Sequence, residues 1–273
     1  MSIRLAIFFS LTIGLLSCSD SLEDPAQNNP LDPDNPSFIP PFTTLISGPS
    51  EGEIIDTADV TFIWRGIRGD SEYSYRLVDS VWSDWSVDTI VSFTFLDELE
   101  YLFEVKSRYL SGIEEEQPKS INFIVDAVQG PSFTFFKRHN FVETDEIFTV
   151  TILAENVEDL FAAQIQIEYN SGKLEVMDVV GRDAETDFLR KNGGDVILFS
   201  EIDSDLSLII IDIGIWSGDP AGVSGTGALI DIHFKALNSG STHLRFNRDS
   251  QMRSPSNIPI TINDFPEGLV EID

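Results

Sequence analysis

A succession of short alternating segments, separated by turn residues, constrains this chain more than any other feature of its sequence. From about residue 42 to the last residues, apolar and polar positions alternate, and no long helical period interrupts them. Such alternation places successive side chains on opposite faces of a β-strand. The sequence therefore predicts an all-β fold built of two β-sandwiches.

The first sandwich is expected over residues 42–127. Its alternating segments divide into strands at 42–46, 60–64, 73–78, 81–85, 91–95, 101–109 and 121–125, with Trp64 in the core. This number of strands suits an immunoglobulin-like sandwich. The run Leu99-Glu100-Tyr101-Leu102-Phe103-Glu104-Val105 resembles the Leu-x-Tyr-x-Phe-x-Val strand of fibronectin type III and related domains.

The second sandwich is expected over residues 130–273, with strands at 148–157, 161–169, 173–176, 195–200, 207–215, 227–236, 242–246, 258–262 and 268–272. Four motifs follow in order: Glu155-Asn156-Val157, the corner from Ile167 to Val176, Gly225-x-Gly227-x-Leu229-x-x-Ile232-x-Phe234, and Gly268-x-Val270-x-Ile272. In this order they resemble a cohesin domain. The resemblance implies a jelly-roll sandwich that docks dockerin modules of extracellular, often polysaccharide-degrading, enzymes and catalyses nothing.

The strand expected at 207–216 is apolar on both faces. Ile209, Ile211, Ile213 and Ile215 share one face, and Leu208, Ile210, Asp212, Gly214 and Trp216 share the other. A strand with one solvated face should carry polar residues there. The second face is therefore covered either by a loop of the chain or by a partner. In the cohesins that this region resembles, the corresponding strand lies in the dockerin-binding sheet.

Two further strands are expected to extend this surface. The segment 161–169 would present Ala162, Gln164 and Gln166, and the segment 227–236 would present Leu229, Asp231, His233 and Lys235. An apolar centre with a polar edge is typical of protein interfaces. Many cohesins carry Asn and Asp where this chain has Ala162 and Gln164. The predicted partner-binding residues are Ala162, Gln164, Gln166, Leu208, Ile210, Asp212, Trp216, Asp231 and His233.

The amino terminus predicts export. Arg4 precedes an apolar run over residues 5–16, which is shorter than the roughly 20 residues of a membrane-spanning helix. The ending Leu15-Leu16-Ser17-Cys18 resembles the lipobox of bacterial lipoproteins, which implies a signal peptide at 1–17 and a lipid on Cys18. A plain signal peptide with an incidental cysteine is the alternative. Residues 18–41 are rich in proline and predict a disordered tether from the cell envelope or outer surface.

The charge of the chain restricts its partners. Its 46 acidic and 17 basic residues give a net charge of −29. Such a surface repels phosphate backbones, so we expect no nucleic-acid partner. The excess of acidic residues is explained either by solubility or by binding of structural calcium, although the sequence has no EF-hand loop. No cofactor is predicted.

The sequence shows no catalytic motif. His139, His233 and His243 stand in separate segments without a ligand-type partner, and Asp203 and Asp205 lie in a predicted turn. No nucleophile elbow or phosphate-binding loop is present, so we expect a binding protein and not an enzyme. The Trp82-Ser83-Asp84-Trp85-Ser86 match to a cytokine-receptor pattern is taken as coincidence. Trp82, Trp85 and Trp216 leave direct carbohydrate binding as an alternative to protein binding, and a structural role in the envelope as a third.

Overall fold

The computed structural model describes residues 30, 32–67, 71–77, 80–217 and 221–273. Within these residues, the regular structure is β-strand apart from the 3₁₀ helix η2 (Phe188–Arg190). This confirms the all-β class and the sandwich architecture predicted from the alternation. The expected signal peptide and Cys18 lie outside the described residues. No helix in the described part is long and apolar enough to cross a membrane.

The N-terminal sandwich consists of two sheets around an aromatic core. One sheet has the order β1 (Thr43–Ser47), β3 (Val60–Gly66), β5 (Ile90–Phe93), and the other has the order β2 (Glu53–Ile55), β7 (Lys119–Val125), β6 (Glu100–Tyr109), β4 (Ser71–Leu77). Phe62 of β3 stacks on Phe103 of β6 with ring centroids 3.8 Å apart, and both side chains are fully buried. Trp64 is buried in this core, as predicted.

The prediction of a strand at 81–85 is wrong. These residues form a loop that runs beside β4 without a regular ladder of hydrogen bonds. The hydrogen-bonded residues Ser83 and Ser86 are three positions apart, whereas their partners Tyr75 and Tyr73 are two positions apart, so the register does not match. The Ser83 N–H donates to the Tyr75 carbonyl (2.9 Å), and the Ser86 N–H donates to the Tyr73 carbonyl (3.0 Å). The short parallel strand β2, which the sequence did not predict, completes the sheet beside β7.

The loop is held by its tryptophan rings. Lys106 of β6 lies over both the Trp82 ring (5.0 Å to the centroid) and the Trp85 ring (5.1 Å). Arg76 lies over Trp82 at 4.6 Å, and Arg108 lies over Trp85 at 4.4 Å. Alternating cations and rings therefore cover this side of the sheet, an arrangement stabilised by cation–π attraction.

The C-terminal sandwich also has two sheets. The smaller has the order β12 (Leu174–Gly181), β15 (Val223–Ala236), β10 (Ile147–Leu160), β8 (Ser132–Phe136). The larger has the order β13 (Asp195–Asp203), β14 (Leu208–Ser217), β11 (Ala162–Glu168), β16 (Gly240–Phe246), β19 (Gly268–Ile272), β9 (His139–Val142), with β17 (Gln251–Arg253) beside β11 and β18 (Pro259–Ile260) beside β17. Isoleucines of β11 and β14 meet Ile230, Ile232 and Phe234 of β15 in its core.

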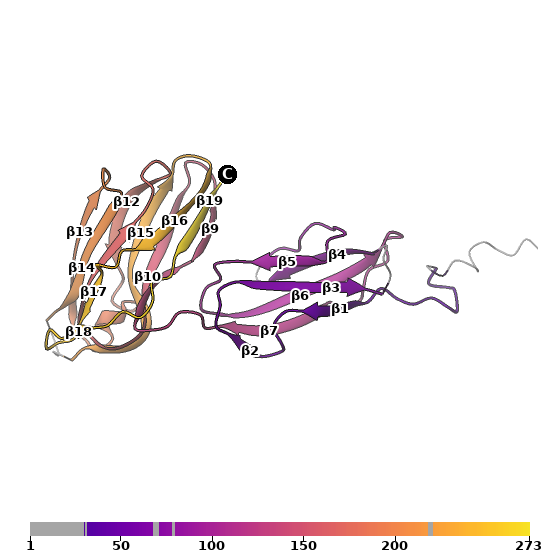
Figure 1. The fold of residues 1–273 in the computed structure, drawn as a ribbon, viewed down its shortest axis with the longest axis horizontal. Helices are drawn as coiled ribbons and strands as arrows, with labels where there is room; N and C mark the ends of the chain where they lie inside the picture. Colours follow the sequence, from indigo (N-terminus) through magenta and orange to yellow (C-terminus); the bar gives the residue numbers. More distant parts are fainter. Residues whose placement is uncertain (1–29, 31, 68–70, 78–79, 218–220) are drawn as a thin grey trace, which may run out of the picture.

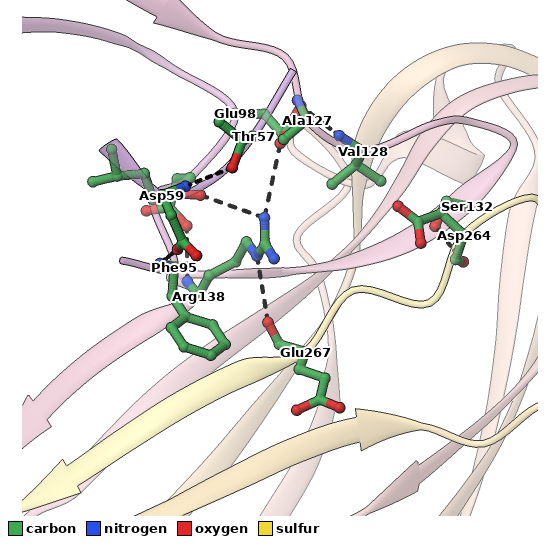
Figure 2. A network of polar contacts seen from close by, with 12 residues as sticks. Thr57, Asp59, Phe95, Glu98, Ala127, Val128, Ser132, Arg138, Asp264 and Glu267 are labelled. Atoms are coloured by element: carbon green, nitrogen blue, oxygen red, sulfur yellow. Dashed lines mark hydrogen bonds and ion pairs between the residues drawn. The ribbon is translucent and has the colours of Figure 1, made fainter. Parts of the chain in front are cut away.

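The two sandwiches follow one another along the long axis of the molecule, with the strands of the C-terminal sandwich steeply inclined to those of the N-terminal one (Figure 1). Arg138, which follows β8, is buried at the junction and points between the two sandwiches (Figure 2). Its backbone N–H donates to Asp97 Oδ1 at 2.7 Å, and its Nη1 lies 4.0 Å from Glu98 Oε1. Its Nε donates to the Glu267 carbonyl at 3.4 Å. One buried cation therefore contacts both sandwiches.

The described end of the expected tether contacts the N-terminal sandwich. The Tyr109 hydroxyl donates to the Ile39 carbonyl at 2.8 Å, and the Phe38 ring meets the Tyr109 ring edge to face at 6.5 Å. Pro41 is buried. The segment 32–42 leaves the N-terminal sandwich at the end opposite to the C-terminal sandwich (Figure 1).

Candidate functional site

The two outer faces of the C-terminal sandwich differ in chemistry. The outer face of the β12-β15-β10 sheet is polar, and its polar groups bind one another. Asp231 accepts from Thr151 Oγ1 at 2.6 Å and from Arg182 Nη1 at 2.6 and 2.8 Å, while the His233 ring nitrogen pairs with the Thr149 hydroxyl at 3.0 Å. A sheet that faces water on one side is expected to carry such residues there.

The outer face of β13, β14, β11 and β17 carries more apolar surface. The strand register fixes which side chains lie side by side. Three cross-strand rows result: Ile197, Gly214, Ala162 and Arg253; then Phe199, Asp212, Gln164 and Gln251; then Glu201, Ile210 and Gln166. We call this surface the β13–β17 face.

A short polar chain crosses the centre of the β13–β17 face. Gln164 Nε2 donates to Asp212 Oδ1 at 2.9 Å, and Gln166 Nε2 donates to Gln164 Oε1 at 3.3 Å. At the edge, Arg253 Nη2 donates to Gln251 Oε1 at 2.7 Å. These bonds hold the amide side chains in fixed positions, so the face presents a defined pattern of donors and acceptors.

Phe199 and Trp216 are the most exposed aromatic side chains around this surface. Phe199 of β13 is 63% exposed, and Trp216 at the end of β14 is 75% exposed. Large apolar side chains that gather at one surface mark interaction sites more often than single ones do. Phe199 therefore lies open to solvent beside β14.

A shallow depression of about 440 Å³ lies over the first two rows of the β13–β17 face, those of Ile197 and Phe199. Gly214 and Ala162 form its floor, between Ile197 and Phe199 on one side and Gln251 and Arg253 on the other. A Cβ atom on Gly214 would stand 3.0 Å from the Ala162 Cβ, so a side chain there would crowd Ala162. The small residues therefore create the hollow.

The structure brings most of the predicted binding residues together. The side chains that share the β13–β17 face are Ala162, Gln164, Gln166, Leu208, Ile210 and Asp212, and Trp216 continues their alternation. Their role in binding stays a prediction.

The prediction that Asp231 and His233 belong to the same patch is wrong. Both lie on β15, which is hydrogen-bonded to β10 and β12 in the other sheet, so they face the opposite side of the sandwich. Leu229 does not face outward either, because the register shifts between Ile152 and Leu153 and turns it into the core. Alternation identifies the faces of a strand but not the sheet to which the strand belongs.

Sequence reasoning did not include β13 in this surface and missed the strand β17 altogether. Residues 195–200 were expected to form a strand, and the alternation of Ile197 and Phe199 with Val196 and Leu198 signals two apolar faces, as in β14. Gln251 and Arg253 lie on β17, a strand too short to produce a recognisable alternation.

The residues considered for chemistry serve local structure. Asp203 Oδ1 accepts from the Leu206 N–H at 2.9 Å in the turn between β13 and β14. His139 contacts the Thr94 carbonyl at 3.2 Å, at the junction of the sandwiches. Among the described residues, no three His, Cys, Asp or Glu side chains come together so that they could hold a metal ion.

Solved structures that resemble about half of this chain include cohesin domains. A non-cellulosomal cohesin from Archaeoglobus fulgidus is 16% identical, with a TM-score of 0.40, over 52% of this chain and 91% of that one. The cohesin OlpA of a cohesin–dockerin complex from Clostridium thermocellum is 15% identical, with a TM-score of 0.40, over 52% and 98%. A type II cohesin domain from the cellulosome of Acetivibrio cellulolyticus is 13% identical, with a TM-score of 0.40, over 51% and 95%. No family model and no curated protein matches the chain.

Proposed function

We propose that this chain is an exported, lipid-anchored binding protein of the cell envelope, and that the β13–β17 face docks a dockerin-type extracellular protein. The observation that carries the proposal is the contrast between the two outer faces of one sandwich. One face satisfies its polar groups internally, and the other presents Phe199, Ile210 and a hollow lined by small residues. The order of the cohesin-like motifs in the sequence supports a dockerin as the partner.

The charges around the β13–β17 face define the partner further. Glu201 and Asp203 lie along the edge strand β13, and Asp212 lies at the centre, whereas Arg253 stands on the opposite side of the hollow. A partner with an apolar stripe, and with lysine or arginine beside β13, would be complementary to this pattern. Electrostatic complementarity of this kind raises the association rate and is weakened by salt.

Ile210→Asp tests the docking surface. The substitution places a carboxylate in the row between Glu201 and Gln166, and we expect binding of a calcium-loaded dockerin panel to fall by at least about tenfold. Ile147→Asp is the matched control, because Ile147 is an exposed isoleucine of β10 on the polar outer face. Surface plasmon resonance on the full chain measures both. Equal loss in the two variants, or none in either, refutes the assignment of the face.

The anchor requires a separate test. We infer lipidation from Leu15-Leu16-Ser17-Cys18 alone. Cys18→Ser should move the protein from the membrane fraction to the soluble fraction of the envelope and abolish incorporation of labelled palmitate. Unchanged membrane association of this variant would refute the anchor without affecting the docking surface.

Direct carbohydrate binding is the second candidate, and the exposed ring of Trp216 favours it. Trp82 and Trp85 do not add to it, because two cationic groups lie over each of their rings and occupy the stacking surface. Affinity electrophoresis in polysaccharide gels, with Trp216→Ala as the comparison, distinguishes this function. Retardation that is lost in Trp216→Ala would support it.

A further inference from the structure

A second cleft lies where the two sandwiches meet. It has a volume of about 420 Å³ and is lined from both sandwiches. Ligand-binding clefts are typically about 300–1,000 Å³ and often lie between domains. The depression on the β13–β17 face shares no lining residue with it, so the two are separate features of the molecule.

The walls of this cleft are apolar and accessible. Ile54, Leu99 and Ile124 line it from the N-terminal sandwich, and Phe136 and Leu153 line it from the C-terminal sandwich. Ile54 is 63% exposed on β2, the edge strand of its sheet. Apolar side chains from two sandwiches thus face one solvent-accessible space.

A polar group without a partner is buried at the same place. Thr134 of β8 lines the cleft and is 1% exposed, and its hydroxyl has no hydrogen-bond partner. Its neighbours Phe133 and Phe135 belong to the core of the C-terminal sandwich, so the alternation of β8 turns Thr134 to the cleft side. Glu98 Oε1 is likewise buried without a hydrogen bond. Buried polar atoms of this kind are unfavourable until a ligand or water binds them.

The cleft also holds more negative charge than the protein neutralises. Asp97, Glu98, Asp126 and Glu155 line it. Burial raises the pKa of Glu98, and repulsion from Glu155 adds to this; burial also raises the pKa of Glu155, and repulsion from Asp126 adds to that. Arg138 Nη1 approaches Glu98 only to 4.0 Å and donates to the Leu96 carbonyl at 3.5 Å, while its Nε donates to the Glu267 carbonyl.

We propose that this cleft binds a segment of another protein in which a lysine or arginine stands between apolar residues. The cation would meet Glu98 and Glu155 beside the Thr134 hydroxyl, and the flanking residues would contact Ile54, Leu99 and Phe136. The chain's own segment 19–41 contains no lysine or arginine, and a second copy of a chain with net charge −29 is repelled. A metal ion does not fit, since the described carboxylates form no ligand set.

The test uses the full chain with labelled isoleucine and leucine methyl groups. Ac-Leu-Lys-Leu-NH₂ should shift the methyl signals of Ile54, Ile124 and Leu153 in a saturable manner. The same peptide with acetylated lysine keeps its length but loses its charge, and should bind at least about tenfold more weakly. Equal binding of the two peptides, saturable shifts confined to Ile210 on the other face, or no saturable shift would overturn the proposal.

Two variants separate binding from folding. Glu155→Gln should weaken the lysine peptide by about tenfold, and unchanged core methyl signals of Ile165 and Ile211 verify the fold. If Glu155→Gln fails to fold, Asp126→Asn replaces it, because Asp126 is exposed. Thr134→Val should weaken the peptide while leaving the thermal midpoint equal or higher, since it removes an unpartnered hydroxyl. Calcium chloride that produces the same shifts, reversed by a chelator, would assign the cleft to a metal and overturn the peptide proposal.

Discussion

The ion pair between Glu98 and Arg138 should couple the stabilities of the two sandwiches. The perturbation is a double-mutant cycle with Glu98→Gln, Arg138→Met and the double variant. Glu98 Oε2 accepts from the Ala127 N–H (2.9 Å) and the Val128 N–H (3.3 Å), and a glutamine oxygen can keep these bonds. Arg138→Met retains much of the side-chain volume but loses the charge and its donors.

The magnitude follows from the 4.0 Å separation of Arg138 Nη1 and Glu98 Oε1. Two unit charges at this distance interact by about 1 kcal/mol in a water-like medium and by about 4 kcal/mol at an effective dielectric constant of about 20. The side chains are only 9% and 16% exposed, so the value lies between these limits. We expect a coupling energy of about 2 kcal/mol. Arg138→Met alone should cost about 3 kcal/mol, because it leaves a buried carboxylate unpaired.

Urea unfolding followed by tryptophan fluorescence provides the assay. Trp64, Trp82 and Trp85 report on the N-terminal sandwich, and Trp216 reports on the C-terminal one. The measurement belongs at pH 8, since burial raises the pKa of Glu98 and the pair needs the ionised form. A coupling energy within about 0.3 kcal/mol of zero would refute the reasoning, because independent sites add to within that range. So would a coupling that vanishes in about 1 M salt, which identifies a solvent-exposed pair.

Two further predictions concern acid and the tryptophan loop. Burial raises the pKa of Asp97, Glu98 and Glu155 above 3.8, 4.5 and 4.5, so the folded state holds these protons more tightly than the unfolded state. Stability should therefore fall as pH rises through the window above these values, and the thermal midpoint should be higher at pH 5 than at pH 8; a triple Asn/Gln/Gln variant with the same pH slope would contradict this. Lys106→Met removes the cation that lies over two rings and should cost about 1–2 kcal/mol in urea unfolding. Glu114→Gln, which removes only the Lys106 ion pair, should cost less, and an equal loss would show that the rings contribute nothing.

The sequence was most informative for β14, where regular alternation coincided with apolar residues on both faces of the strand. In β14, four isoleucines at every second position predicted the inward side, and all four are buried. The apolar residues between them identified the outward face that β11 extends. These inferences need only the two-residue period of a strand, so they hold for any partner strand.

The sequence did not predict which strands share a sheet. From Ile230 onward β15 alternates as regularly as β14, but its partners are β10 and β12, more than 40 residues away in the chain. Likewise, the 81–85 loop has the aromatic content of a strand, and only its mismatched spacing against Tyr73 and Tyr75 prevents a ladder. Both outcomes depend on which distant backbone groups meet, which local periodicity does not encode.

The orientation of the N-terminal sandwich along the long axis determines how the molecule would carry tension. A pull between the segment 32–42 and the C-terminal sandwich enters the N-terminal sandwich at β1 and leaves it at β7, at opposite ends (Figure 1). The strands run along the line of that pull, so the hydrogen bonds of β1 with β3, and of β7 with β6 and β2, are sheared together instead of opening one after another. Resistance to such a force depends on the unfolding rate and not on the equilibrium stability. The N-terminal sandwich is thus oriented to transmit a pull on the segment 32–42 to the C-terminal sandwich as a stiff mechanical link.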